Sequence, residues 1–249
     1  LEAPGSVTME FPDLVALAAV ARERGVTTAL DNTWGSGLAF DPFAFGAAGG
    51  GGPNAVDVSV QALTKFASGG GDVLMGSVTT RDEALHLRLK FTHMRVGAGV
   101  AGNDVEMVLR SLSSLPLRYA AQARAGLRLA EWWQGRPEVA QVLHPALAGS
   151  PGHEHWAQLC SDAAGLFSVV FASRYASRQV DAFVDALKLF RIGYSWAGPV
   201  SLAVPYDLAA LRMRTKVAYE GQIVRFALGL EDVDDLVDDC TQALAALGD

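Results

Sequence analysis

The feature that most constrains the fold is an alternation of helical and strand-like segments in the first third of the chain. Residues 11–25 place apolar side chains at helical spacing, and Gly25 suits the end of that helix. Three short apolar segments follow, at residues 26–30, 55–61 and 72–79. Asp31 stands at the end of the first of them. Strands that alternate with helices predict an α/β fold with a mainly parallel sheet.

The remainder of the chain predicts mixed α+β structure. Residues 102–135 are strongly helical, and Pro116 with the serines just before it predicts a break into two helices. Further strands are expected at 139–143, 166–172 and 223–228, and further helices at 179–190 and 233–247. We therefore expect two domains, comprising residues 1–112 and 113–249.

Composition narrows the class of protein. Half of the 249 residues are hydrophobic and 19% are charged, which favours a sizeable core over disorder. The net charge of -7 argues against a nucleic-acid-binding protein, because such proteins carry a basic face. No apolar run reaches the roughly 18 to 20 residues that span a bilayer, so we expect no membrane partner.

The cysteines and the first residues indicate a compartment. Cys160 and Cys240 form neither a metal-ligand spacing nor a disulfide framework, so a reducing, cytoplasmic location is expected. No signal segment follows Leu1, and the chain reads as part of a longer protein.

Two residues at strand ends are candidates for chemistry. Lys65 follows the strand at 55–61 and precedes a glycine-rich loop, where α/β folds bind ligands. A partly buried lysine can attack carbonyl groups, but Lys65 could also simply pair with Asp72. Asp31 could be a cap, a ligand contact or an ion-pair partner. Together the lysine and the acid suggest pyridoxal 5′-phosphate (PLP), which needs a covalent lysine and an acid at its ring nitrogen.

The glycine-rich segment at 47–53 has two interpretations. Four glycines and a proline are typical of a flexible surface loop. A phosphate cradle is the alternative, although no Lys-Ser or Lys-Thr pair follows, as it would in a P-loop.

Short stretches along the whole chain form a distinctive set. In order they are Glu2-Ala3-Pro4-Gly5-Ser6, Asp31-Asn32-Thr33-Trp34, Thr64-Lys65-Phe66, residues 69–76, His144-Pro145-Ala146-Leu147, Gly165-Leu166-Phe167-Ser168, Tyr194-Ser195-Trp196-Ala197-Gly198 and Gly229-Leu230-Glu231-Asp232. With these stretches the chain resembles the Cys/Met-metabolism family of PLP-dependent enzymes. The resemblance implies the second part of a fold type I, aspartate-aminotransferase-like large domain at 1–112, and a C-terminal α+β small domain at 113–249.

The resemblance also implies roles for the site residues. Lys65 would form the Schiff base and then move the proton, and Asp31 would pair with the pyridine nitrogen. Thr33 would lie against the ring and Thr64 would bind the phosphate. The residues at the substrate's carboxylate end would be Ser195, Trp196 and Arg225.

Other interpretations of these residues remain open. Trp196 could pack beside Pro199, and Arg225 could form a structural ion pair with Glu231. His153 and His155 flank Glu154, but no third ligand is in view, so we expect no metal site. Two positions depart from the family pattern: Ala62 replaces a serine that often binds phosphate, and residues 69–72 read Gly-Gly-Gly-Asp instead of Gly-His-Ser-Asp.

The expected reaction follows from the Tyr194-Ser195-Trp196 stretch. It resembles the bacterial cystathionine β-lyases, whereas γ-lyases and γ-synthases usually carry Ser-Leu-Gly-Gly there. The resemblance implies cleavage of cystathionine to homocysteine, pyruvate and ammonia by a homo-oligomer, a dimer of dimers. The family's earlier residues supply a tyrosine that stacks on the cofactor and a phosphate-binding turn. The alternatives are an inactive or scaffold-like fragment, or a γ-lyase or γ-synthase.

Overall fold

The computed structural model describes residues 1–45, 55–207, 219 and 221–248. Its elements, in chain order, are α1 (Leu14–Glu23), β1 (Ala29–Asp31), β2 (Val58–Ala62), β3 (Gly76–Thr79), α2 (Glu83–Val96), α3 (Gly102–Leu112), α4 (Leu115–Gln134), β4 (Val139–Leu143), α5 (His153–Leu159), β5 (Leu166–Phe171), α6 (Ser177–Ala186), β6 (Arg191–Ile192), β7 (Leu202–Tyr206), β8 (Ile223–Ala227), α8 (Val233–Ala243) and the 3₁₀ helix η1 (Leu244–Leu247). The predicted glycine-rich loop at 47–53 lies outside the described residues.

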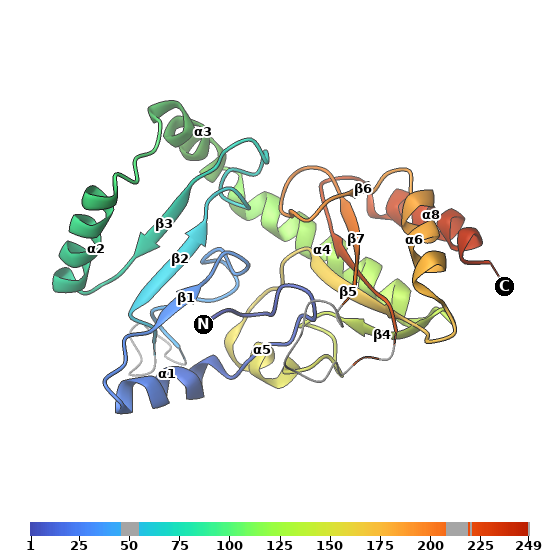
Figure 1. Ribbon diagram of the computed structural model, residues 1–249, viewed down its shortest axis with the longest axis horizontal. Coiled ribbons are helices and arrows are strands. Elements are labelled where there is room, and N and C mark those ends of the chain that lie inside the picture. The colour runs from blue at the N-terminus through green and yellow to red at the C-terminus, as the bar shows by residue number, and fades with distance from the viewer. Residues whose placement is uncertain (46–54, 208–218, 220, 249) are drawn as a thin grey trace.

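The strands form two sheets, which lie on opposite sides of the molecule in Figure 1. The first has the order β1-β2-β3 and the second has the order β4-β5-β8-β7-β6. Mixed sheets with helices confirm the α/β class. The expectation of a mainly parallel first sheet holds only for β1 and β2, because β3 returns antiparallel to β2. The connection from β2 to β3 contains no helix, and a parallel return would need a crossover.

Local signals explain where the first elements begin and end. The Asp13 carboxylate caps α1 by accepting from the Ala16 N–H at 2.9 Å. Gly25 lies just beyond that helix with a φ of 63°, a conformation that favours glycine. Ser113 and Ser114 separate α3 from α4, and proline occupies the first turn of α4, so the predicted break is confirmed.

Two hydrophobic clusters hold the fold together. One lies on the five-stranded sheet under α4, α6 and α8, around the buried Trp133, whose ring contacts Phe171, Phe183 and Phe226. The other joins both sheets, since Leu30 of β1 and Ile223 of β8 belong to the same cluster. The two sheets therefore share a core, and the site lies beside it.

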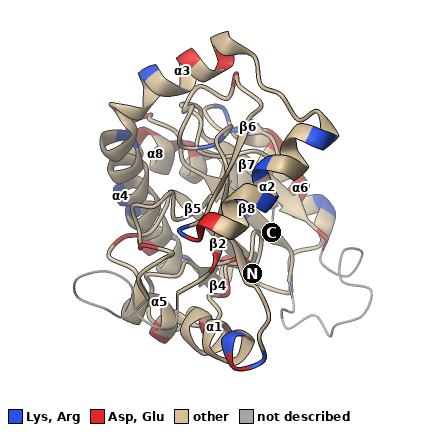
Figure 2. Ribbon diagram, turned by 90° about the vertical axis from the view of Figure 1, so that its left-hand side faces the viewer, with Lys and Arg blue, Asp and Glu red and all other residues tan. Residues whose placement is uncertain are grey.

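Charged side chains of both signs are distributed over the helices. Figure 2 shows Lys and Arg interspersed with Asp and Glu on α1, α2 and α3, so this side presents no purely basic surface. No helix within the described ranges is long and apolar enough to cross a membrane.

Candidate functional site

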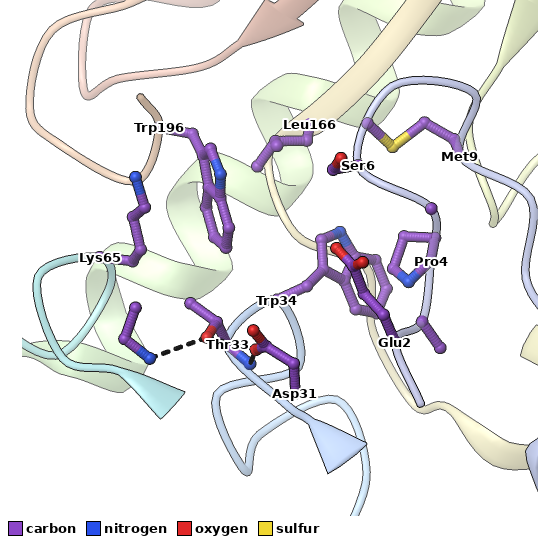
Figure 3. Close-up of a pocket in the computed structure, with 13 residues that line it drawn as sticks. Glu2, Pro4, Ser6, Met9, Asp31, Thr33, Trp34, Lys65, Leu166 and Trp196 are labelled. Carbon is purple, nitrogen blue, oxygen red and sulfur yellow. Dashed lines mark hydrogen bonds between the residues drawn. The ribbon is translucent and has the colours of Figure 1, made fainter. Parts of the chain in front are cut away.

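A pocket opens where the ends of β1 and β2 face the five-stranded sheet (Figure 3). Three groups of residues line it: the first residues of the chain, the ends of β1 and β2 with their turns, and two residues from the other sheet's side. They are Glu2, Ala3, Pro4, Gly5, Ser6, Met9, Asp31, Thr33, Trp34, Ala62, Lys65, Leu166 and Trp196. The topology thus brings four of the predicted site residues, Asp31, Thr33, Lys65 and Trp196, into one cavity.

Asp31 ends β1 and is held by Thr33. The backbone N–H and the hydroxyl of Thr33 donate to Asp31 Oδ1 at 2.9 and 2.5 Å, and the Ala62 N–H donates to the Thr33 hydroxyl at 2.8 Å. The carboxylate is therefore fixed to the end of the neighbouring strand β2. Within the described part of the chain, no hydrogen bond occupies the other oxygen, Oδ2, and Asp31 lines the pocket.

Lys65 lies in the turn that follows β2. Its Nζ donates to the Ser195 hydroxyl at 2.7 Å and lies 5.2 Å from the centroid of the Trp196 ring. Burial lowers the pKa of this amine from its ordinary value, and the nearby Arg225 guanidinium lowers it further. The alternative pairing with Asp72 does not occur among the ion pairs of the described residues. A lowered pKa favours the neutral amine that a covalent or proton-transfer role requires.

Arg225 lies on β8, buried behind the pocket with 4% of its surface exposed. One terminal nitrogen, Nη1, donates to the Ser6 carbonyl at 3.1 Å, and the other, Nη2, donates to the Tyr194 carbonyl at 2.6 Å. Its Nε is buried and has no hydrogen-bond partner among the residues that the structure describes. The carboxylate of Glu231 accepts from Ser201 instead, so the predicted alternative of an Arg225–Glu231 ion pair is wrong.

Burial also shapes the chemistry of Arg225. Desolvation lowers the pKa of the guanidinium, while Tyr206, whose ring lies 5.3 Å away, opposes that change. A buried guanidinium with unpaired N–H groups is a site for a bound carboxylate.

The remaining predicted residues have distinct surroundings. The Trp196 ring packs edge-on against Phe66 with the centroids 5.6 Å apart, beside Lys65. The Thr64 hydroxyl donates to the Met75 carbonyl at 3.5 Å and accepts from the Met75 N–H at 3.3 Å. This ties Thr64 to the segment before β3, and its contact with a phosphate stays a prediction.

Several pocket residues were not among the predicted site residues. Glu2 forms a parallel bridge with Asp31, and burial and the Asp31 charge raise the pKa of the Glu2 carboxyl. Trp34 is buried, and its indole N–H has no hydrogen-bond acceptor within the described ranges. Both residues lie within the stretches by which the sequence resembles the family, so that resemblance could have identified them as site residues.

The histidines near α5 have local contacts. His153 Nδ1 lies 2.8 Å from the Pro145 carbonyl oxygen, and its ring stacks on Trp156. In residues 1–45, 55–207, 219 and 221–248, no three His, Cys, Asp or Glu side chains gather as metal ligands would.

Comparison with known proteins gives the family. The Cys/Met metabolism PLP-dependent enzyme family matches residues 1–245. The chain belongs to this family. It is 40% identical over 247 residues to a cystathionine β-lyase of Bordetella avium, covering 98% of this chain and 59% of that protein. With a cystathionine β-lyase of Escherichia coli it shares 34% identity over 99% of this chain and 61% of that protein.

Solved structures agree with this family membership. A cystathionine γ-synthase from Xanthomonas oryzae pv. oryzae, in complex with aminoacrylate and cysteine, superposes with a TM-score of 0.86 at 26% identity. The match covers 99% of this chain and 62% of that one. The chain thus spans about three fifths of the length of the curated relatives it matches.

PLP is the cofactor of this family, and the residues present fit it. Asp31 offers an unoccupied carboxylate oxygen for a protonated ring nitrogen, and Lys65 offers an amine with a lowered pKa. The buried Nε of Arg225, which has no hydrogen-bond acceptor among the described residues, could donate to a bound anion near the same pocket.

Proposed function

We propose that this chain works as a PLP-dependent carbon–sulfur β-lyase that converts cystathionine and water to homocysteine, pyruvate and ammonia. The observation that carries the proposal is the position of the Lys65 amine. It lies in the pocket with Asp31, touches Ser195, and has Arg225 close enough to lower its pKa. An amine, an acid and a guanidinium are the groups that this chemistry needs.

The cofactor would be held by groups at the ends of β1 and β2. Asp31 would accept a hydrogen bond from the protonated ring nitrogen, and Thr33 would keep that carboxylate in place. Lys65 would carry the cofactor covalently. When bound, PLP supplies an electron sink for the negative charge that develops at the substrate's α carbon.

Lys65 would then act as a base. Its amine, when free, would take the proton from the substrate's α carbon. The lowered pKa keeps a larger share of this amine neutral near pH 7 than an exposed lysine has. The hydroxyl of Ser195, 2.7 Å from Nζ, would orient the amine between the two tasks.

Arg225 would hold the substrate's α-carboxylate. Two of its N–H groups already donate to backbone carbonyls, which orients the guanidinium. Among the described residues, no other hydrogen bond uses Nε or the second N–H of either terminal nitrogen. Fixing the carboxylate orients the bond from the α carbon to the β carbon, and such positioning lowers the barrier.

The proposal of β-cleavage is based on the loop that carries Trp196 and on the names of the similar proteins. The residues Lys65, Asp31 and Arg225 serve β- and γ-cleavage alike. The bulk of Trp196 beside the substrate and the 34–40% identity to proteins named cystathionine β-lyase support β-cleavage. Proteins named for γ-synthase or γ-lyase activity are less similar, at 26–30% identity.

The test is product analysis on the protein made from the complete coding sequence and supplied with cystathionine. Pyruvate and homocysteine are expected, and Lys65→Ala should yield neither. Predominant 2-oxobutyrate and cysteine would place the protein among the γ-lyases. Absence of both product pairs, together with no absorption band from bound cofactor, would favour the inactive, scaffold-like alternative.

We also propose that the protein assembles as a homo-oligomer. The helix α2 has no buried residue, and its Leu87, Phe91 and Met94 side chains are 44%, 50% and 65% exposed. Apolar surface of this kind is typical of an interface. Light scattering during size-exclusion chromatography tests this, and a monomer at micromolar concentration would contradict it.

A further inference from the structure

The loop between β6 and β7 supplies several groups to the site without regular structure of its own. Its Tyr194 carbonyl accepts from Arg225, its Ser195 hydroxyl accepts from Lys65, and its Trp196 ring lies against Lys65. Both proposed cationic groups therefore take their orientation from one short stretch of backbone, residues 193–201. Whatever fixes that stretch also fixes the site.

The backbone of this loop is in a conformation that needs support. Ala197, directly after Trp196, is 3% exposed and has a φ of 65°. This is the left-handed region, which residues with a Cβ adopt rarely and keep only when their surroundings hold them there. The structure must therefore contain anchors near Ala197.

The anchors lie immediately after Ala197 and converge on Ser201, which is fully buried. The Glu231 carboxylate accepts from the Ser201 N–H at 2.8 Å through one oxygen and from the Ser201 hydroxyl at 2.7 Å through the other. The same hydroxyl accepts from the Gly229 N–H at 2.8 Å. Ser201 thus links the loop to the segment that follows β8.

Two further contacts close the loop onto its surroundings. The buried Gln122 side chain of α4 donates to the Gly198 carbonyl at 2.8 Å, and the Leu230 N–H donates to the Pro199 carbonyl at 2.9 Å. The packing is tight, because a Cβ added at Gly229 would lie 2.4 Å from both Glu231 Oε2 and the Pro199 oxygen. The loop has little room to move while these contacts hold.

We propose that Glu231 and Ser201 are positioning residues of the site, which hold the 193–201 loop so that Ser195 meets Lys65 and the Tyr194 carbonyl meets Arg225. Neither residue lines the pocket. Their catalytic consequence rests on the proposed function, whereas their effect on Lys65 is a property of the chain itself.

Loss of the anchor has a specific consequence for Lys65. Without the Ser201 contacts the left-handed backbone at Ala197 relaxes, and Ser195 and Trp196 move away from the lysine. Burial is the largest cause of the lowered pKa of Lys65, so an exposed Lys65 should titrate closer to its ordinary value of 10.5. A residue that merely contributes to stability would not change this titration.

The first experiment measures the Lys65 titration in protein without cofactor. The rate of reductive methylation of each lysine is followed against pH by mass spectrometry, with the exposed Lys90 as internal reference. Glu231→Gln turns one accepting oxygen into an NH2 group, and Ser201→Ala removes the hydroxyl. Glu138→Gln, which breaks a pair with Arg136 far from the loop, is the matched control.

In both Glu231→Gln and Ser201→Ala the midpoint for Lys65 should rise above the wild-type midpoint, as reduced burial requires. The Lys90 midpoint should stay unchanged, and Glu138→Gln should behave as the wild type. A Lys65 midpoint that stays unchanged in both variants would overturn the inference, and so would an equal rise in Glu138→Gln.

The second experiment measures lyase kinetics on the protein made from the complete coding sequence. Both variants should lose roughly 10- to 100-fold in kcat/KM, the size expected from small misplacement of site groups, and KM should carry most of the loss. A similar loss in Glu138→Gln would count against positioning. If the wild type itself shows no lyase activity, the proposed function fails, while the methylation result still decides the role of Glu231 and Ser201.

Discussion

The amine of Lys65 donates to the hydroxyl of Ser195 at 2.7 Å, although 130 positions separate the two residues in the sequence. One belongs to the turn after β2 and the other to the loop before β7, so the contact joins the two sheets across the pocket. Because Trp196 and Arg225 also lie near this amine, the lysine is oriented and partly shielded from water before any ligand enters.

The first prediction is that Lys65 carries the cofactor. After incubation with PLP near neutral pH and reduction with borohydride, peptide mapping should find the label mainly on Lys65. The physical reason is its lowered pKa, which leaves more of the reactive neutral amine than an exposed lysine has. Lys65→Ala should remove this label and Lys90→Ala should not. Predominant labelling of Lys90 or Lys188 would refute the assignment.

The second prediction concerns the charge of Asp31. Asp31→Asn keeps an oxygen for the two Thr33 contacts but removes the negative charge that we propose faces the ring nitrogen. The urea midpoint should change little, while kcat should fall roughly 100-fold or more, as when a group that stabilises developing charge is lost.

Asp57 provides the matched control for Asp31. It also accepts from the backbone and hydroxyl of a threonine, Thr28, but lies away from the pocket. Asp57→Asn should therefore retain kcat. Near-normal kcat in Asp31→Asn would show that Asp31 acts only as a cap for the turn.

The third prediction concerns Thr33, whose hydroxyl links Asp31 to the Ala62 N–H. Thr33→Val keeps the shape of this buried side chain but leaves the Ala62 N–H without its acceptor and removes one of the two donors to Asp31 Oδ1. The free energy of unfolding should fall by about 1 to 3 kcal/mol. Urea titration measures this, and Thr33→Ser should retain most of the stability. A Thr33→Val variant as stable as the wild type would show that the hydroxyl contributes nothing, and equal losses in the Val and Ser variants would show that the methyl group contributes as much as the hydroxyl.

Much of the fold could be predicted from local patterns. The strand at 139–143 has the observed bounds, and the helix break after α3 follows from the serines and Pro116. The helix α2 has no counterpart in the prediction because Leu85, Leu87, Leu89 and Phe91 alternate with polar residues, a period typical of strands.

The strand β7 was also missed, for a different reason. Pro205 lies within it, and proline argues against an internal strand. The structure accommodates the proline because β6 pairs with β7 only at Leu202 and Ala203. A strand as short as β6 has too few residues to show a recognisable pattern in the sequence.

The site shows a similar division. Strand-end positions singled out Asp31 and Lys65, and the resemblance to the family added Arg225, Ser195 and Trp196. Contacts such as Arg225 with the Ser6 carbonyl, across 219 positions, depend on tertiary packing and have no local signal. The division into domains at 112 and 113 stays a prediction, which limited proteolysis between α3 and α4 can test.

The last prediction uses His144, which is fully buried between β4 and the turn that follows it. Its Nδ1 accepts from the Ala146 N–H at 3.1 Å, and its Nε2 has no hydrogen-bond partner in the described part of the chain. Burial lowers the pKa of the imidazole from 6.5 to about 4, so the folded state favours the neutral ring.

Above pH 6.5 the ring is neutral in both folded and unfolded chains. As the pH falls from 6.5 to about 4, His144 becomes protonated in the unfolded chain but stays largely neutral in the folded chain. The free energy of unfolding should therefore decrease over this window by about 3 kcal/mol on account of His144.

His144→Asn tests this, because its side-chain oxygen can replace Nδ1 as the acceptor for the Ala146 N–H while nothing titrates. Urea unfolding at several pH values between 4 and 7 should show a smaller loss of stability with acid in the variant than in the wild type, whatever its absolute stability. The exposed His86 of α2 is the matched control, and His86→Asn should keep the wild-type dependence. Parallel curves for wild type and His144→Asn would mean that the imidazole is protonated as readily in the folded protein as in the unfolded chain.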